Sequence, residues 1–285
     1  MKHYIQILVS LSMYTFILSS LFGAGLGLTV KEIIDPLRKI RLVVLALLAN
    51  FVLIPILAYM LCVWLKADAS MQAGLMLLAC CAGAPFLPKL VSLAKGSLAH
   101  SIGLMVLLMV VTVGFAPIIL TMVIPGLSVD PMAIAKPLII LMLLPLGLGL
   151  LIKAIRPEIA VKIGPIVILI SNISLLAWLV FALSIDYKLI ISAYGTGIYN
   201  LTFWFAFGAL LIGYIFSSLD RSERVVMTLG AGARNIAAAL IIAVANFTEP
   251  KVVTVVMIGS LVQFILLFII SRAFGKAKLP GQAIN

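Results

Sequence analysis

Long apolar segments follow one another along almost the whole chain, and they constrain the fold more than any other feature. Between clusters of charged residues, nearly every segment has about 20 to 27 residues, almost all apolar, which at about 1.5 Å rise per residue crosses the roughly 30 Å hydrocarbon layer of a bilayer. Hydrophobic residues make up 64% of the 285 positions and charged residues 10%, more apolar surface than a water-soluble domain can bury. The sequence therefore predicts an all-α polytopic membrane protein.

The boundaries of these segments predict nine membrane-spanning helices within one transmembrane domain, residues 1–285, with interruptions in the third and the eighth helix. The expected spans are Tyr4–Leu28, Leu42–Leu65, Met71–Ala94, Leu98–Ile124, Met132–Ile155, Ile163–Ile185, Ile191–Ser217, Val225–Phe247 and Val252–Ala273. The first span is expected to be retained as a helix, because a basic stop-transfer flank follows it and no small-residue cleavage site precedes a polar start.

The net charge of +11 reports topology rather than nucleic-acid binding, because the basic residues neither share one face nor alternate with aromatic residues. Thirteen lie in connections on one side of the predicted membrane: Lys31, Arg38, Lys39, Arg41, Lys95, Lys153, Arg156, Lys162, Arg221, Arg224, Arg272, Lys276 and Lys278. Five lie on the other side: Lys2, Lys66, Lys136, Lys188 and Lys251. The positive-inside rule then puts the amino terminus outside and the carboxyl terminus in the cytoplasm, as expected for a plasma (inner) membrane protein with nine crossings.

Two basic residues, Lys89 and Arg234, lie within predicted spans, whereas every acidic residue lies in a connection or at a span edge. An intramembrane charge is costly and usually faces a partner or a water-filled cavity, so both are candidates for a functional site. Lys89 has an alternative interpretation as the snorkelling end of an unbroken helix Met71–Pro88. Arg234 lies about 15 Å along a helix from Arg224 and cannot snorkel easily.

Both cations follow residues that break helices. Gly83, Pro85 and Pro88 precede Lys89, and Gly230 and Gly232 precede Arg234. Within a bilayer such breaks persist only where the freed backbone groups line a cavity or are buried in protein. Two interrupted segments at corresponding places in two halves are typical of inverted-repeat transporters with a site at the midplane.

Three stretches carry a resemblance to a known family: "GAGLGLTVKEIIDPLRKIRLVVLALLANFVLIPILAYML", "LLACCAGAPFLPKLVSLAKGSLAHS" and "GAGARNIAAALIIAVANF". Their motifs are the Cys80-Cys81 pair before a Gly/Pro break, Leu93-Ala94-Lys95-Gly96 after it, and Arg234-Asn235 before an alanine-rich run. Over most of its length the chain resembles the bile acid:sodium symporter family of secondary transporters. The resemblance implies inverted repeats, a panel and a core domain, and two broken helices that cross at the substrate site. A nine-helix form follows, with residues 1–125 as a four-helix repeat half and 131–275 as a five-helix half.

The resemblance also locates departures at the positions of the family's sodium ligands. Where the first broken helix of the family usually has Ser-Asn, this chain has Pro88-Lys89. Where the second has a glutamate and then Gln-Asn, it has Gly230 and then Arg234-Asn235; Asn50 stands where the family often has glutamine, and "GLMVLLMVV" lacks the usual hydroxyls. A tethered cation repels a bound sodium ion, so these sodium sites look dismantled. Sodium stays possible as a coupling ion, and no cofactor is expected.

The resulting candidate substrate site has Arg234 as the principal contact of an anion and Lys89 as an auxiliary one, since a guanidinium binds a carboxylate bidentately. Its full membership is Arg234, Lys89, Asn235, Asn50, Pro88, Gly230 and Gly232. An alternative role of the two asparagines is to join helices. The three cysteines, Cys62, Cys80 and Cys81, are expected to pack as small apolar side chains, and no residue set suggests a metal site or catalysis.

Three functions from different classes fit the sequence. The first is a secondary transporter of a small organic anion that does not require sodium. The second is a conventional sodium-coupled symporter of organic anions, and the third is a membrane receptor or assembly subunit that does not transport. An arsenite-type or auxin-type efflux carrier stays open within the family. The expected partners are the anion and the lipid bilayer, without nucleic acid; the substrate, the direction of transport and the oligomeric state stay open.

Overall fold

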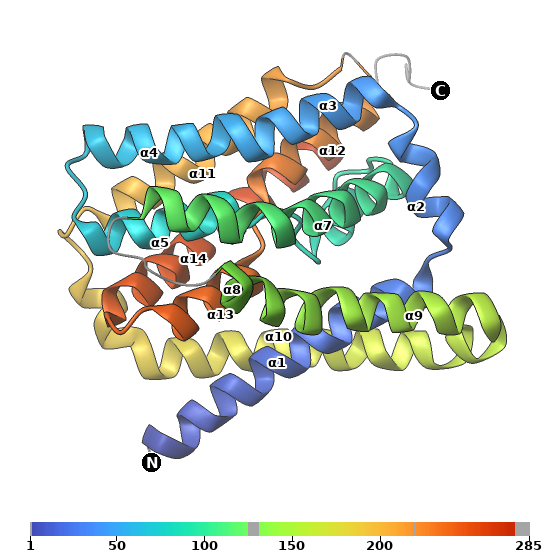
Figure 1. Cartoon of the computed structure of the whole chain (residues 1–285), viewed down its shortest axis with the longest axis horizontal. Coiled ribbons are helices and arrows are strands. Elements are labelled where there is room, and N and C mark those ends of the chain that lie inside the picture. Colours follow the sequence, from blue (N-terminus) through green and yellow to red (C-terminus); the bar gives the residue numbers. More distant parts are fainter. Residues whose placement is uncertain (1, 125–130, 219, 277–285) are drawn as a thin grey trace.

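A computed structural model describes residues 2–124, 131–218 and 220–276, and every regular element in these ranges is a helix (Figure 1). Eight helical stretches are long and apolar enough to cross a membrane, and Ala69–Cys80 is a shorter apolar helix. The expected span missing from these eight is the third, Met71–Ala94, because a break divides it into α5 and α6, which are each too short. The prediction of an all-α polytopic membrane protein is confirmed.

The helices follow the predicted spans closely at most boundaries. In chain order they are α1 (Lys2–Gly27), α2 (Val30–Leu37), α3 (Ile40–Leu48), η1 (Ala49–Leu53), α4 (Ile54–Trp64), α5 (Ala69–Cys80), α6 (Leu87–Leu93), α7 (Leu98–Val123), α8 (Pro131–Leu138), η2 (Ile139–Leu143), α9 (Leu144–Ile155), α10 (Pro157–Ser192), α11 (Ile198–Ile215), α12 (Arg221–Gly232), α13 (Ile236–Asn246) and α14 (Pro250–Lys276). The labels η1 and η2 mark π-helical turns inside continuous spans.

The main differences from the prediction concern α2 and the boundary between α10 and α11. The short helix α2 occupies a stretch expected to be a connection, where Ile33 is buried and the neighbouring charged side chains Lys31 and Glu32 are exposed. The helix α10 extends to Ser192, well beyond the expected Ile185, so α11 begins at Ile198 instead of Ile191. Two glycines between these helices, at positions 195 and 197, have φ angles of 85° and 86°, a conformation that favours glycine and ends a helix.

Each π-helical turn ends two positions before a proline. Pro55 and Pro145 are the second residues of α4 and α9, immediately after η1 and η2. Because a proline has no N–H for the carbonyl one turn earlier, a wider turn accommodates it without ending the span. Asn50, one of the candidate site residues, lies in η1 and is therefore displaced from ordinary helical register.

The helices divide into two groups. The panel consists of α1 and α8–α10, which lie together along the bottom of Figure 1, and the core consists of α3–α7 and α11–α14. Within the panel, α1 and α9 approach so closely that a Cβ on Gly25 would lie 2.3 Å from the carbonyl oxygen of Leu146. Close packing of this kind between glycine surfaces is common in membranes, so Gly25 is a packing residue.

The interruptions lie in the core. The first separates α5 from α6 at residues 81–86, where Gly83 has a φ of 80°, and the second separates α12 from α13 at residues 233–235. The unbroken helix Met71–Pro88 of the alternative interpretation is absent, because α5 ends at Cys80 and Pro88 lies in the first turn of α6, where a proline is tolerated. A long stretch within Arg221–Asn246 is wholly buried, so protein and not lipid surrounds the second break.

The break near Arg234 does not lie at the two glycines that were expected to cause it. Gly230 and Gly232 both lie within α12, and the helix ends only after them. A Cβ on Gly230 would lie 2.8 Å from a methyl carbon of Leu104, and one on Gly232 would lie 2.6 Å from a methyl carbon of Leu210. The two glycines therefore make room for neighbouring helices.

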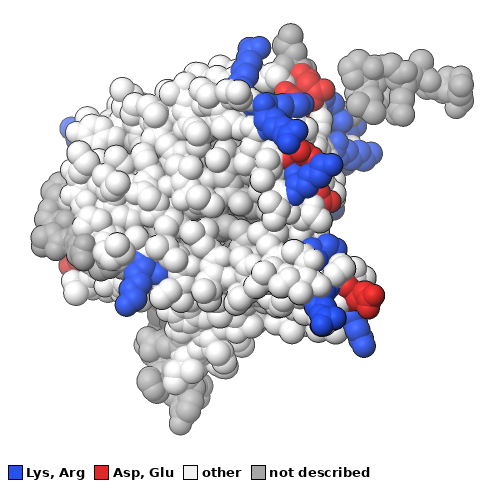
Figure 2. Space-filling view, turned by 45° about the vertical axis from the view of Figure 1, so that its right-hand side comes forward, with Lys and Arg blue, Asp and Glu red and all other residues white. Residues whose placement is uncertain are grey.

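Most basic side chains visible in Figure 2 gather at one end of the molecule, in two groups separated by a recess, and a few lie toward the opposite end. Figure 1 has at this end α2, the start of α3 and the turn between α9 and α10. The topology flanks include exposed Arg38, Lys39 and Arg41, and half-buried Arg221 and Arg224. Several charged residues near the predicted span ends lie outside the described residues or have side chains that are not described: the basic residues Lys2, Lys188 and Lys278, which the topology prediction used, and the acidic residues Asp130 and Asp186.

Candidate functional site

The two breaks cross, and Asn235 joins them. Its backbone N–H donates a hydrogen bond of 2.8 Å to the carbonyl oxygen of Cys81, and its side-chain Nδ2 donates one of 3.1 Å to that of Gly83. Its Oδ1 accepts from the backbone N–H of Ala238 at 3.1 Å and so caps the start of α13. One asparagine thus satisfies groups that both breaks leave free, which explains its complete burial.

Arg234 lies in the second break and is 0% exposed. Its Nε donates to the carbonyl oxygen of Leu78 at 3.1 Å, and its Nη2 donates to that of Ala79 at 2.9 Å. Its Nη1 donates to Asn50 Oδ1 at 2.7 Å and to the carbonyl oxygen of Ala231 at 3.1 Å. Four of the five N–H groups of a guanidinium are therefore bonded to protein oxygens.

The oxygens around Arg234 come from three different elements. The carbonyls of Leu78 and Ala79 belong to the last turn of α5, the carbonyl of Ala231 belongs to the last turn of α12, and the amide belongs to η1. The last turn of a helix has carbonyls without intrahelical partners and carries the negative end of the helix dipole. The guanidinium thus lies between two negative helix ends, which offsets part of the cost of burying its charge.

Two further polar side chains complete the crossing. Thr112 of α7 accepts from the backbone N–H of Ala82 at 3.0 Å and donates to the carbonyl oxygen of the same residue at 3.2 Å. Gln263 of α14 donates to the carbonyl oxygen of Arg234 at 3.4 Å. The sequence interpretation missed both, although single polar residues in "VVTVG" and "LVQFI" are the signal for side chains that satisfy another helix.

Lys89 lies elsewhere, on the wall of a cavity between the panel and the core. The cavity has a volume of about 230 Å³ and is lined by α1, α6, α7, α10 and the first break. The Lys89 ammonium donates a hydrogen bond to Asn172 Oδ1 of α10. Pro88 lines the same cavity, whereas Arg234 and Asn50 do not. The structure therefore separates the two cations that the sequence interpretation brought together.

Besides Lys89 and Ser20, Ser171 gives this cavity a polar group. Its side chain is only 2% exposed, it lines the cavity, and its hydroxyl has no hydrogen-bond partner among the described residues. A buried hydroxyl without a partner costs free energy that a bound ligand or water recovers. Neither Ser171 nor Asn172 was singled out from the sequence, because an isolated Ser-Asn pair in an apolar span is not distinguishable from residues that join helices.

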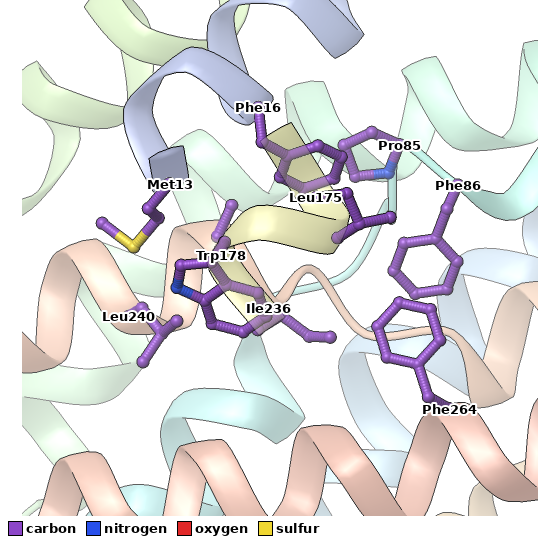
Figure 3. Close-up of a pocket in the computed structure, with 10 residues that line it drawn as sticks. Met13, Phe16, Pro85, Phe86, Leu175, Trp178, Ile236, Leu240 and Phe264 are labelled. Atoms are coloured by element: carbon purple, nitrogen blue, oxygen red, sulfur yellow. The ribbon is translucent and has the colours of Figure 1, made fainter. Parts of the chain in front are cut away.

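On the other side of Pro85, the space between panel and core narrows to a cavity of about 20 Å³ with apolar walls. Figure 3 shows Phe16 and Trp178 from the panel facing this space, with Phe86 and Phe264 from the core beside it. The rings of Phe86 and Phe264 are stacked with their centroids 4.5 Å apart. Because both cavities include Pro85, a larger compartment whose lining includes Lys89 and two serines and a narrow apolar one lie on either side of the first break.

The sulfur and acidic residues form no alternative centre in the described part of the chain. Cys62, Cys80 and Cys81 are free and buried, as expected for small apolar side chains. The described residues contain no group of three or more histidines, cysteines or acidic residues that could hold a metal ion.

Comparisons with known proteins identify the family of the chain. A family model described as the sodium bile acid symporter family matches residues 14–193, which include the first break and Lys89. Over 213 residues the chain is 25% identical to a protein of Arabidopsis thaliana described as "Probable sodium/metabolite cotransporter BASS3, chloroplastic". The match covers 73% of this chain and 49% of that protein, so the chain spans about half the length of this curated relative.

Proposed function

The chain belongs to the sodium bile acid symporter family, and from this premise we propose that it is a secondary transporter that moves a small organic anion between its panel and its core. Membership points to a transporter of small molecules and not to an enzyme. The name of the Arabidopsis relative refers to a sodium/metabolite cotransporter, and the chain shares 25% identity with it. The proposed substrate is negatively charged and contacts residues that lie between panel and core.

The observation that carries this proposal is the Lys89 cavity. It is lined by the Lys89 ammonium group and by the Ser171 hydroxyl, which has no partner among the described residues; Asn172, which bonds Lys89, is not part of the lining. A carboxylate or similar group accepts hydrogen bonds from an ammonium and from a hydroxyl, and a hydrogen bond to a charged group is among the stronger ones. No acidic residue lines the cavity. Its volume of about 230 Å³ suits a small organic acid.

The two cations have different roles in this proposal, because Lys89 is exposed on the cavity wall whereas Arg234 is buried at the crossing. Lys89 contacts the anion from α6, beside Pro88. Arg234 holds the crossing together with Asn50 and Asn235, because four of its donors are already bonded to protein oxygens. The glycines of α12, Gly230 and Gly232, provide the close packing that the crossing needs. This division replaces the initial expectation that Arg234 is the principal anion contact.

The proposed orientation places the amino terminus outside, the carboxyl terminus in the cytoplasm, and the Lys89 cavity open toward the cytoplasm in a plasma (inner) membrane. It rests on the thirteen-to-five distribution of basic residues. In this proposal residues 1–125 and 131–275 are the two repeat halves. A tag added at Met1 should react with a reagent that cannot cross the membrane, whereas a tag at Asn285 should react only after permeabilisation. Equal reactivity of both tags on intact cells would contradict nine crossings.

We expect transport to proceed without a sodium gradient, because a fixed guanidinium occupies the oxygens at the crossing. At an effective dielectric constant of about 20, two unit charges about 4 Å apart interact by roughly 4 kcal/mol, which corresponds to about a thousandfold in sodium affinity. The test is uptake of labelled carboxylates into proteoliposomes with sodium replaced by choline on both sides. The carboxylates are those that raise the melting temperature of the purified protein in a screen of organic acids. Uptake should change by less than about tenfold.

The second candidate, a conventional sodium-coupled symporter, has the family name and the name of the relative in its favour. A loss of more than about tenfold in choline, equivalent to about 1.4 kcal/mol of coupling, would establish sodium dependence. Uptake no faster than into protein-free liposomes, for every acid that binds, would contradict both transporters and favour a receptor. A sodium ionophore, which collapses a sodium gradient, should abolish any sodium-dependent uptake.

A further inference from the structure

The oxygens that surround Arg234 form a cation site. Three are main-chain carbonyls and one is the amide oxygen of Asn50, and none carries a negative charge. Uncharged oxygens from carbonyls and amides are among the ligands of small hard cations. In transporters with broken helices, unwound carbonyls and the carboxyl ends of half-helices coordinate the coupling cation. Here the same kind of oxygen set surrounds a side chain.

We infer that the Arg234 guanidinium is a built-in substitute for a free cation, and that its removal turns the crossing into a binding site for a small cation from solution. The inference deepens the proposed function, because it gives a physical cause for transport without sodium. It makes a prediction about this chain that the transport assay does not make: the variant, and not the wild-type protein, should depend on the cation in the buffer.

The burial of the site is the reason to expect that a variant without the guanidinium binds a small cation. Arg234 and Asn50 are 0% and 1% exposed, so the carbonyls that Arg234 bonds would lose their partners without reaching bulk water. Those carbonyls stand at the negative ends of α5 and α12, which favour a positive charge and not merely a hydrogen-bond donor. Truncation of the side chain to alanine frees the volume of the guanidinium at the same position, between oxygens that η1, α5 and α12 hold in place.

The experiment compares melting temperatures of purified wild-type protein and the variant Arg234→Ala in choline chloride, sodium chloride and choline chloride with 10 mM guanidinium chloride, a concentration far below denaturing levels. Wild-type protein should melt within about 1 °C in all three. Arg234→Ala should melt at least about 5 °C lower in choline, and sodium at about 0.1 M or guanidinium should restore about 3 °C or more in a saturable manner. Guanidinium is the probe that matches the deleted group.

Three matched variants keep the test decisive. Arg234→Lys keeps a charge at the crossing and should respond to sodium less than Arg234→Ala does. Arg224→Ala removes a half-buried arginine from the first turn of the same helix and should show no cation-specific change. If Arg234→Ala gives no folded protein, Arg234→Gln carries the test, since it supplies a neutral donor and no charge.

Two results would overturn the inference. One is a wild-type protein that sodium stabilises by more than about 3 °C relative to choline, which would indicate a free cation beside Arg234. The other is an Arg234 variant that melts at the same lower temperature in all three salts. These measurements involve no substrate, so sodium-independent uptake combined with a cation-indifferent variant would refute the inference and leave the proposed function intact.

Discussion

Replacement of Gly83 by alanine should reduce the yield of folded protein at least about tenfold. Gly83 has a φ of 80°, and its carbonyl oxygen accepts the hydrogen bond from Asn235 at the crossing. A Cβ at this position would lie 2.4 Å from the backbone nitrogen and 2.7 Å from the Cα of Met109, atoms of α7 that cannot move aside by a side-chain rotation. The left-handed conformation costs roughly 1–2 kcal/mol for alanine and such overpacking roughly 1–3 kcal/mol more.

The control for this variant is Gly114→Ala. Gly114 belongs to α7, the helix that Gly83 contacts, but a Cβ at Gly114 would meet nothing within 4 Å. Alanine is favoured over glycine inside a helix by about 1 kcal/mol, so this variant should fold at least as well as the wild-type protein. Size-exclusion profiles of detergent extracts and melting temperatures provide the measurement. Equal behaviour of the two variants would mean that the first break does not approach α7 as described.

Replacement of Lys89 by glutamine should lower the rate of anion uptake at low substrate concentration by about 10-fold to 100-fold. Glutamine keeps a polar group on α6 near Asn172 but removes the charge, and a hydrogen bond to a charged group contributes about 1.5–3 kcal/mol. Because the lost interaction is with the bound anion, the change should appear mainly as a higher KM. Initial rates measured over a range of anion concentrations provide the test.

Lys95→Gln is the matched control for Lys89→Gln, because Lys95 is exposed and lies just beyond the end of α6. It removes the same charge from the same region without touching the cavity, so its KM should equal that of the wild-type protein. An unchanged KM in Lys89→Gln would move the anion away from this cavity. A rise in both variants would indicate general electrostatic attraction at the membrane surface instead of a specific contact.

The first break contains Gly83 and Pro85, whereas Gly230 and Gly232, from which the second break was expected, lie inside α12. The sequence was sufficient to predict the spans, from their apolar length, and the existence of both breaks. It was not sufficient for the length of α10, which depends on glycines in a left-handed conformation at positions 195 and 197. Two local signals conflicted there, since the apolar pattern continues past Ile191 while the backbone turns. Short amphipathic α2 was missed because eight residues offer too few periods for a pattern to be recognised.

The partners of Arg234 could not be predicted for a different reason. They are mostly main-chain carbonyls, which every residue possesses. One of them, the carbonyl of Ala79, lies 155 positions away in the sequence. The charge pattern therefore predicted an important buried cation without predicting what it bonds. The same limitation applies to Lys89, whose neighbour Asn172 comes from a panel helix that shares no motif with α6.

The burial of Arg234 also bears on the energetics of the proposed cycle. A coupling ion that binds from one solution and leaves into the other carries its charge across, whereas a guanidinium attached to the backbone returns with the protein and moves no net charge. A monoanion transported alone would therefore make the cycle electrogenic. Across a membrane with 100 mV, negative inside, the potential contributes about 2.3 kcal/mol per charge, or roughly fiftyfold in the equilibrium distribution of the anion. Unless another ion compensates, a carrier of this kind would distribute its substrate toward the outside and so act in export under resting conditions.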